Sequence, residues 1–261
     1  KRQMEWEAFG RQGFPGWHIE CTAMSMKYLG EHFDIHCGGV DHIPVHHTNE
    51  IAQAEAITDK RPWVAYWLHN EFVLMGDEKM AKSGDNFITL ASIKERGFEP
   101  LAYRYLVLQT HYRKQLTFTW EALAAAAAAL SNLRDHVRRI PAHAAADSSV
   151  EKNFLAAIND DLNIPEALAV LWDALKAQSI DLPTVIRFDK VLGVALHDPN
   201  LDELPTSVQE LLEKRAAARA EKRWPESDKL RAQIEALGFA LEDAADGRQR
   251  VLPKHASIGE E

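Results

Sequence analysis

The sequence predicts an α/β region that is followed by an all-α region, a helical bundle, and then by a small tail domain. Up to about residue 90 the chain is rich in glycine, histidine and tryptophan and contains short β-type runs, and beyond it helical patterns follow one another. The first part has the order strand, glycine loop, helix, strand, which is typical of a parallel α/β sheet. Pro199 and Pro205 mark a linker. We therefore expect three domains, over residues 1–90, 91–200 and 201–261.

Helices and strands alternate in the first region. The apolar residues of 17–29 recur at helical spacing, and the glycines and proline of 13–16 are typical of a turn. Gly38 and Gly39 interrupt the β-type run that begins at Phe33. In order, the sequence predicts a helix over 17–29, a strand over 33–36, a helix over 46–57 and a strand within 64–74.

The second region is a series of helices with recognisable starts. Thr89 and Thr119 are candidate N-caps, and Pro165 suits a first helical turn because its missing N–H is not needed there. The alanine run over 124–129 has the highest helix propensity available, and we interpret it as part of a closely packed helix. After the short helix that Thr89 begins, the predicted helices cover 98–110, 120–139, 150–158, 165–178, 183–196, 208–223 and 227–237. Gly238 is a suitable residue to end the last one.

The composition excludes several classes of protein. The 261 residues include 30 Lys+Arg and 39 Asp+Glu, and the net charge of −9 excludes a protein that binds nucleic acid through bulk positive charge. Only 2 cysteines are present, which argues against a disulfide scaffold and indicates a reducing compartment. The sequence has no apolar run long enough to span a membrane and does not start like a signal peptide. We therefore expect a cytoplasmic monomer without a membrane partner.

Cys21, His46 and Glu50 form a candidate metal site. His46 and Glu50 are four residues apart, so both side chains point from one face of a helix. A thiolate, an imidazole and a carboxylate suit Zn²⁺ and leave one coordination position open. The alternative is that the cysteine is a packing residue and the pair a solvated contact. Spacing alone does not choose the ligands, because four further histidines lie close in the sequence: His18, His36, His42 and His47.

Two loops carry residues that suit the binding of phosphate. The glycines of Gly38-Gly39-Val40-Asp41 let a phosphate approach the backbone, and the Asp41 carboxylate is able to accept ribose hydroxyls, although two adjacent glycines often form only a turn. The second loop holds Lys79, Lys82 and Ser83. Mobile lysines neutralise phosphate charge that develops in a transition state, although an exposed polar loop is the simpler interpretation of this segment.

Several short sequence segments, taken together, favour the functional interpretations of the metal site and of the two loops. They cover 16–21, 33–41, 46–53 and 79–83, and then 103–105, 112–113, 160–167, 236–239 and 241–243. In order and spacing they resemble cysteinyl-tRNA synthetase, a class I aminoacyl-tRNA synthetase, over essentially the whole chain. The resemblance implies the second half of a Rossmann-type class I catalytic domain, a helical stem-contact and bundle domain, and a tail similar to the tRNA anticodon-binding domain.

The resemblance also implies roles for individual residues. The family's zinc ligands fall on Cys21, His46 and Glu50, and the tryptophan that borders its cysteine pocket falls on Trp17. Its KMSKS loop falls on residues 79–83, with alanine at 81 in place of the first serine. The implied catalytic residues are Lys79, Lys82 and Ser83, and the implied residues for ATP, which carries Mg²⁺, are Gly38, Gly39, Asp41 and Lys82.

The family reaction defines the expected partners. Zinc binds the thiol of cysteine, the carboxylate of cysteine attacks the α-phosphate of ATP, and the cysteinyl group then passes from the adenylate to tRNA(Cys). A steric pocket separates cysteine from serine by only about 1–3 kcal/mol, which is the reason for a metal. Basic residues within 100–120 and 211–231 suit contacts with tRNA phosphates. The expected tRNA contacts are Arg104, Arg113, Lys114, Arg215 and Arg219.

The chain also departs from the family pattern. The family's first half-sheet, its HIGH motif and its fourth zinc ligand lie upstream of residue 1, and Arg250 stands where the family commonly has a tryptophan. We therefore expect the chain alone to be nearly inactive in adenylation, as a fragment, as one part of a split enzyme with a separate N-terminal half, or as a paralogue. Two alternatives are a cysteine:sugar-amine ligase of the mycothiol pathway, against which the tail argues, and a non-catalytic module that binds tRNA or another partner.

Overall fold

The computed structural model describes residues 5–76, 78–79, 88–197, 205–243 and 249–253. The chain divides into two compact units, Lys1–Lys79 with Tyr112–Thr117 and Met80–His111 with Phe118–Glu261. Among the described helices, none combines the length and the apolar character that a membrane span requires. The division into three domains stays a prediction.

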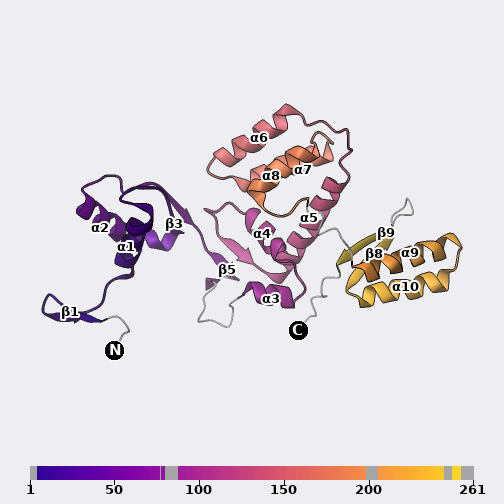
Figure 1. The fold of residues 1–261 in the computed structure, drawn as a ribbon, viewed down its shortest axis with the longest axis horizontal. Coiled ribbons are helices and arrows are strands. Elements are labelled where there is room, and N and C mark those ends of the chain that lie inside the picture. The colour runs from indigo at the N-terminus through magenta and orange to yellow at the C-terminus, as the bar shows by residue number, and fades with distance from the viewer. Residues whose placement is uncertain (1–4, 77, 80–87, 198–204, 244–248, 254–261) are drawn as a thin grey trace. The chain divides into compact units, whose positions relative to one another are not determined.

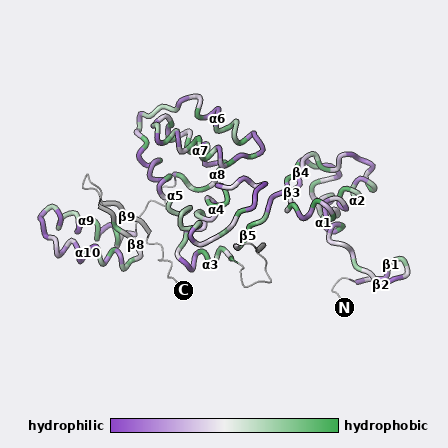
Figure 2. Tube along the Cα trace, turned by 180° about the vertical axis from the view of Figure 1, so that it is seen from behind, coloured by the Kyte–Doolittle hydropathy of each residue, from purple (hydrophilic) through white to green (hydrophobic). Residues whose placement is uncertain are grey.

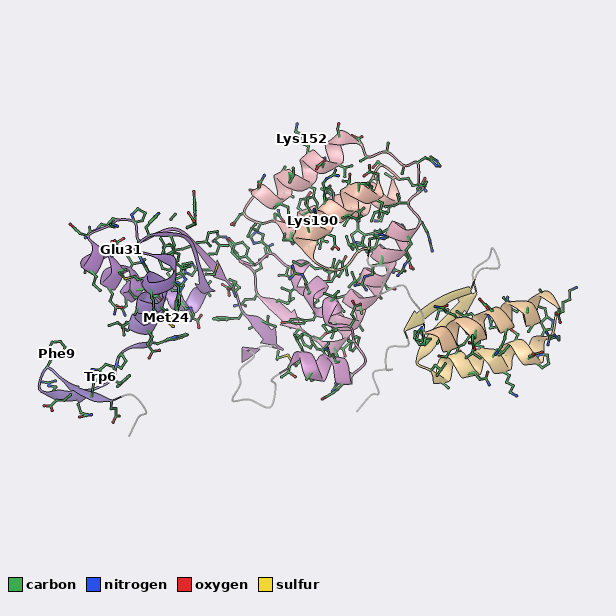
Figure 3. All side chains as sticks on the ribbon, in the orientation of Figure 1. Trp6, Phe9, Met24, Glu31, Lys152 and Lys190 are labelled. Atoms are coloured by element: carbon green, nitrogen blue, oxygen red, sulfur yellow. The ribbon has the colours of Figure 1, made fainter. Side chains whose placement is uncertain are left out.

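The first unit begins with a hairpin that the sequence pattern did not predict. Strands β1 (Trp6–Ala8) and β2 (Arg11–Gly13) pair in antiparallel fashion. Phe9 and Gly10 between them both have positive φ angles, and the Phe9 side chain at the tip is fully exposed (Figure 3). A positive φ is unusual for phenylalanine, and the turn has Phe9 where the usual hairpin signal has asparagine or aspartate before the glycine.

A two-stranded parallel sheet and two helices form the centre of the first unit (Figure 1). Helix α1 (Trp17–Leu29) has the predicted bounds and packs against helix α2 (Thr48–Thr58). Strands β3 (Phe33–Gly39) and β4 (Val64–Asn70) pair in parallel, which confirms the predicted direction. His36 lies opposite Trp67, and Gly38 lies opposite His69. Because side chains alternate along strands, these four residues share one face of the sheet.

Strand β3 corrects the predicted role of its glycines. The strand continues through Gly38 and Gly39 rather than ending before them. A Cβ atom at Gly38 would lie 2.5 Å from a carbon of the His47 ring and 2.7 Å from His42 Nδ1. Glycine at this position therefore lets two imidazole rings approach the strand backbone.

The start of α2 is a second correction. The predicted helix begins at 46, whereas α2 begins at Thr48 and follows a 3₁₀ turn (Val40–His42) and one π-helical turn (Ile43–His47). Pro44 lies in the first turn of the π segment and has no N–H to donate to a regular helical ladder. His46 and His47 are therefore held by a wider turn than that of an α-helix, a feature that often occurs at functional sites.

A small sheet completes the strands near this region. Its strand order is β6-β5-β7, and the strands are β5 (Val73–Met75), β6 (Glu78–Lys79) and β7 (Leu116–Phe118). The sequence predicted a strand near β5 but not β7. The backbone N–H of Glu71 donates to the carbonyl oxygen of Tyr112, and that of Leu116 donates to Phe72, so residues 112–117 join the first unit.

Six helices follow in the order that the sequence predicts. They are α3 (Leu90–Glu95), α4 (Pro100–Leu108), α5 (Trp120–Arg138), α6 (Ser148–Asn159), α7 (Ile164–Lys176) and α8 (Leu182–Leu192). Thr89 forms a capping box with Ser92, and Thr119 accepts a hydrogen bond from the backbone of Ala122, so both predicted N-caps are confirmed.

The core of these helices confirms the interpretation of the alanine run. Ala126 and Ala127 are buried in α5, which packs against α4 and α7. Small side chains allow neighbouring helices to approach closely. Between α6 and α8, the rings of Phe154 and Phe188 stack with their centroids 3.7 Å apart.

The tail contains two helices and an unpredicted hairpin. In helices α9 (Thr206–Ala220) and α10 (Trp224–Ala236) hydrophilic and hydrophobic residues alternate along the length (Figure 2), and Gly238 with its positive φ ends α10 as expected. Strands β8 (Phe239–Asp243) and β9 (Gln249–Pro253) pair in antiparallel fashion, with position 250 opposite position 242. Val208, Ile234 and Leu241 form the buried core. Most of the predicted linker lies outside the described residues.

Candidate metal centre and substrate site

The structure brings the three predicted metal ligands together. Cys21 lies in α1, His46 in the π turn and Glu50 in α2, and their ligand atoms all lie within 4.8 Å of one another. The packing of α1 against α2 and against the π turn produces this arrangement. A sulfur, an imidazole nitrogen and a carboxylate oxygen at such distances suit a zinc ion with one further ligand.

Glu50 is the most constrained member of this group. Its side chain is 0% exposed, and its Oε2 accepts a 2.7 Å hydrogen bond from His36 Nε2. The other oxygen, Oε1, is 2.6 Å from His46 Nε2, but among the described residues it has no hydrogen bond of acceptable geometry. A buried carboxylate oxygen without a donor is costly. A cation beside Oε1 would remove that cost, so the residues fit a metal ion.

The protein's own charges act differently on the two proposed ligands Cys21 and His46. Burial raises the pKa of the Cys21 thiol, and the Glu50 and Glu20 carboxylates raise it further, whereas a hydrogen bond from Trp17 lowers it. Burial lowers the pKa of His46, and Glu50 opposes this effect. The imidazole is therefore neutral near pH 7 and has a lone pair to offer. A bound cation favours the thiolate and so reverses the effect of the carboxylates on Cys21.

Trp17 lies beside the proposed ligands. Its ring centroid is 4.4 Å from that of His46 and 5.3 Å from that of His42, and the side chain is 59% exposed. An exposed indole next to a metal group is a suitable wall for a small amino acid. That Trp17 borders a cysteine pocket stays a prediction.

Further histidines surround the same carboxylate. His36, His47 and Glu50 form a second set whose ligand atoms lie within 4.8 Å of one another. A 2.8 Å hydrogen bond joins His47 Nδ1 to His69 Nε2, and burial lowers the pKa of His47 to about 4. His36 and His47 are among the histidines between which spacing does not choose, and no motif in the sequence points to His69. Alternation along β3 and β4 was the signal that could have placed His36 and His69 on the face of Gly38.

The residues expected at the ATP site are only partly described. Gly38 and Gly39 end β3, and Asp41 is exposed in the following 3₁₀ turn. A Cβ atom at Gly39 would lie 2.5 Å from Asp41 Oδ1, so this glycine gives room to the carboxylate of the chain itself. Lys79 ends β6, whereas Lys82 and Ser83 lie outside the described residues. The nucleotide contacts of all six stay predictions.

Comparison with known proteins decides the family. Residues 1–128 match the family model of the tRNA synthetases class I (C) catalytic domain, and residues 201–251 match that of the cysteinyl-tRNA ligase anticodon binding domain. Cysteine–tRNA ligase 1 of Burkholderia lata is 47% identical over 95% of this chain and 54% of its own length. The cysteine–tRNA ligase of Treponema denticola is 41% identical over 92% of this chain and 56% of its own length. The chain belongs to the cysteine–tRNA ligase family.

The chain spans about half the length of the curated cysteine–tRNA ligases it matches. The match of residues 201–251 to an anticodon-binding domain does not favour the mycothiol-pathway alternative. Among solved structures, the ternary complex of Agrobacterium radiobacter K84 agnB2 LeuRS with tRNA and LeuAMS has a TM-score of 0.41 at 16% identity, over 64% of this chain and 26% of that chain. That likeness is too low to carry an argument.

In this ligase-family chain, the five expected tRNA contacts differ in how they are held within the protein. Arg104 Nε donates a 2.7 Å hydrogen bond to the carbonyl oxygen of Leu192, at the end of α8, so its guanidinium stabilises the bundle. Arg215 is 1% exposed, and this burial corrects the expectation that it contacts a tRNA phosphate. Arg113 and Lys114 are exposed, and the guanidinium of Arg219 lies 5.9 Å from the ring of Trp224.

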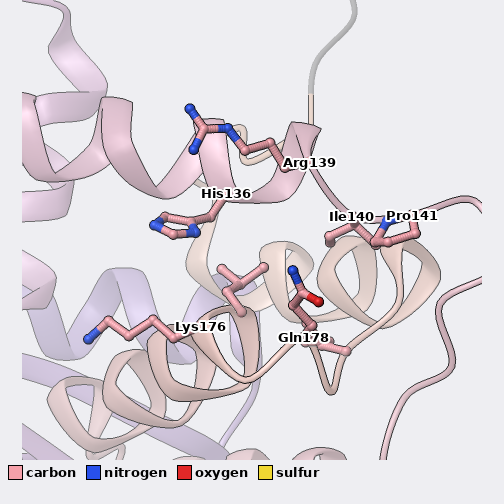
Figure 4. Close-up of a pocket in the computed structure, with 8 residues that line it drawn as sticks. His136, Arg139, Ile140, Pro141, Lys176 and Gln178 are labelled. Atoms are coloured by element: carbon pink, nitrogen blue, oxygen red, sulfur yellow. The ribbon is translucent and has the colours of Figure 1, made fainter. Parts of the chain in front are cut away.

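A cavity elsewhere in the ligase-family chain does not contribute to this site. It has a volume of about 190 Å³ and lies between the ends of α5 and α7, where His136, Arg139 and Lys176 line it (Figure 4). Basic residues at helix ends interact favourably with the last carbonyl groups of the helices. None of the predicted site residues lines this cavity.

Proposed function

We propose that this chain provides the cysteine-selecting and tRNA-binding parts of a cysteine–tRNA ligase. In this proposal residues 1–90 form the second half of a Rossmann-type class I catalytic domain, residues 91–200 contact the tRNA stem, and residues 201–261 form the anticodon-binding tail. The observation that carries the proposal is the convergence of Cys21, His46 and Glu50 at the buried Oε1 of Glu50, which has no hydrogen bond of acceptable geometry among the described residues.

Selection of the amino acid is the role that we propose for this group. Cys21, His46 and Glu50 would hold a zinc ion with one position open to the substrate. Zinc supplies a preference for a sulfur ligand over the hydroxyl of serine, a discrimination that a steric pocket provides only to about 1–3 kcal/mol. Trp17 lies beside His46 and limits the space for the rest of the amino acid.

Activation of cysteine requires charge compensation at ATP. The carboxylate of cysteine attacks the α-phosphate of Mg²⁺–ATP, which yields cysteinyl-adenylate and pyrophosphate. In our proposal Gly39 gives room to the Asp41 carboxylate, which accepts hydrogen bonds from the ribose. Lys79, which ends β6, and Lys82, which adjoins Ser83 in sequence, neutralise charge that develops on the phosphates.

Restoring the rest of the catalytic domain is the test of this function. Chain purified alone and chain combined with the N-terminal half of a curated relative are compared in cysteine-dependent exchange of pyrophosphate into ATP. We expect the combination to be active and the chain alone to be slower by at least about 10²-fold, because the donors of a HIGH motif are missing. Serine in place of cysteine is the control substrate. No exchange by the combination, together with zinc-free protein that still binds tRNA, would indicate the non-catalytic module instead.

Contacts with tRNA are proposed for four basic residues that reach solvent, of which Arg113, Lys114 and Lys214 are exposed and Arg219 is half-buried. Arg113 and Lys114 lie in the loop after α4, and Lys214 and Arg219 lie on α9. Local basic faces of this kind allow a chain of net charge −9 to bind a polyanion. Arg215 is replaced in this set by its exposed neighbour Lys214.

Charge reversal on α9 tests these contacts. The double variant Lys214→Glu/Arg219→Glu is expected to bind tRNA(Cys) more weakly and to show a flatter dependence of affinity on salt, by about 0.7–0.9 in log–log slope for each lost phosphate contact. Filter binding across salt concentrations measures both effects. The matched control is Lys27→Glu/Lys60→Glu, which makes the same charge change at exposed lysines of residues 1–90, to which we assign no tRNA contact. An equal loss in both double variants would mean that only net charge matters.

A further inference from the structure

We propose that His36 is a positioning residue that orients Glu50 for the metal ion. Its ring holds one oxygen of the carboxylate, and the other oxygen is thereby left facing Cys21 and His46. The inference rests on the proposed zinc site and adds to it a residue outside the predicted ligand set.

The hydrogen bond between His36 and Glu50 fixes the direction of the carboxylate. His36 Nε2 lies 2.7 Å from Glu50 Oε2. An ionised carboxylate only accepts hydrogen bonds, so the proton of this contact lies on His36 Nε2. The plane of a carboxylate group is set once one oxygen is held. Oε1 is then directed to the space that it shares with His46 and with the sulfur of Cys21.

The ring of His36 is itself held in place by the sheet. It stacks on the Trp67 ring with a centroid distance of 4.7 Å and an interplanar angle of 20°, and its parallel register places it opposite Trp67. The Phe33 and Trp63 rings contact it at 5.8 Å and 6.0 Å. A donor with its orientation locked by packing loses little entropy when it binds the carboxylate. Partners of this type orient metal ligands in many metalloproteins.

The second histidine set is the competing interpretation of the same contacts. In that set His36, His47 and Glu50 would themselves bind the ion. Two of its members already bond to protein atoms, because His36 Nε2 donates to Glu50 Oε2 and His47 Nδ1 bonds to His69 Nε2. In the set that contains Cys21, Glu50 Oε1 lies 2.6 Å from His46 Nε2, and among the described residues this oxygen has no hydrogen bond of acceptable geometry. The geometry therefore favours His36 as a partner of the ligand rather than as a ligand.

Zinc affinity separates the two interpretations. The dissociation constant for Zn²⁺ is measured by competition with a chromophoric chelator for the unchanged chain, His36→Ala, His36→Gln and His47→Gln. We expect His36→Ala to bind about 10–100-fold more weakly, which is the usual effect of losing such a partner. Glutamine places an N–H close to the position of Nε2, so His36→Gln is expected to recover most of the affinity. His47→Gln is expected to bind as the unchanged chain does.

Two further readouts make each outcome decisive. Co²⁺ bound at Cys21 gives a thiolate charge-transfer band, which His36→Ala should retain at saturating metal. Thermal unfolding in the presence of chelator shows whether each variant is folded. If His36→Ala is not folded, His36→Gln tests the inference in its place. The inference about His36 would be overturned if His36→Ala bound zinc as tightly as the unchanged chain, or if His36→Gln did not recover zinc affinity. The proposed zinc site would still stand in that case, provided that zinc binding depends on Cys21. Loss of metal in His47→Gln would place the ion in the second set. An unchanged chain that binds no zinc would overturn the zinc site itself.

Discussion

Replacing Cys21 by serine is expected to weaken zinc binding by about 100-fold or more. The serine hydroxyl is a poor ligand for zinc near neutral pH, and it leaves the site with one imidazole and one carboxylate. Glu50 remains buried in the variant, with its Oε1 still without a hydrogen-bond donor among the described residues. Zinc content after dialysis and a chelator titration measure the change.

Cys37→Ser is the matched control for this prediction. Cys37 is the second cysteine of the chain, is exposed, and lies next to His36 in β3, so its side chain points to the opposite face of the sheet. Both variants remove one sulfur atom, but only Cys21 lies among the proposed ligands. Equal zinc content in the unchanged chain and in Cys21→Ser would show that the assignment of the site is wrong.

Replacing Arg134 by alanine is expected to lower the free energy of unfolding of the helical region by about 2–4 kcal/mol. The Arg134 side chain is 11% exposed and forms a bidentate pair with Glu99 at 2.7 and 2.8 Å. It also donates to the carbonyl oxygens of Val194 and Ala195, after the end of α8. Truncation leaves a carboxylate and two carbonyls without these donors. The expected cost lies below that of a fully buried pair because the Glu99 side chain is 34% exposed.

Arg187→Ala is the control for this variant. Arg187 in α8 also forms a bidentate pair with Glu151 in α6, but the side chains of both residues are exposed to solvent. Exposed pairs contribute about 0–1 kcal/mol. Urea unfolding followed by helical circular dichroism measures both variants. A loss of stability as small for Arg134→Ala as for Arg187→Ala would contradict the role that the structure gives to burial.

Helices were the part of the fold that local sequence rules could predict. Capping threonines, apolar periodicity and a proline in a first turn are signals contained within a few residues. The hairpin of β1 and β2 was not predicted because its strands are short and because its turn places Phe9 in a backbone conformation that phenylalanine rarely adopts. The π turn before α2 escaped because no residue type specifies it.

The site was predictable in its residue types but not in their arrangement. Spacing could not choose among the histidines, because which rings meet depends on the register of β3 with β4 and on the packing of α1 on α2. For Arg215 the helical spacing of the sequence indicated burial, whereas the count of charged residues suggested a tRNA contact. Arg215 follows Val208 by seven residues, or two helical turns, so it lies on the buried face of α9. Periodicity was the better guide than charge at this position.

The π turn has a consequence for how chain length can vary in this family. His36 and Glu50 are 14 residues apart in sequence, and the connection between them contains the wide turn at Ile43–His47. Deleting one residue there would allow a regular α-helix, but it would rotate α2 by about 100° relative to β3. Glu50 would then turn away from His36. Natural variants with insertions or deletions are therefore expected to place them outside this connection, even though a shorter one would form the more regular helix.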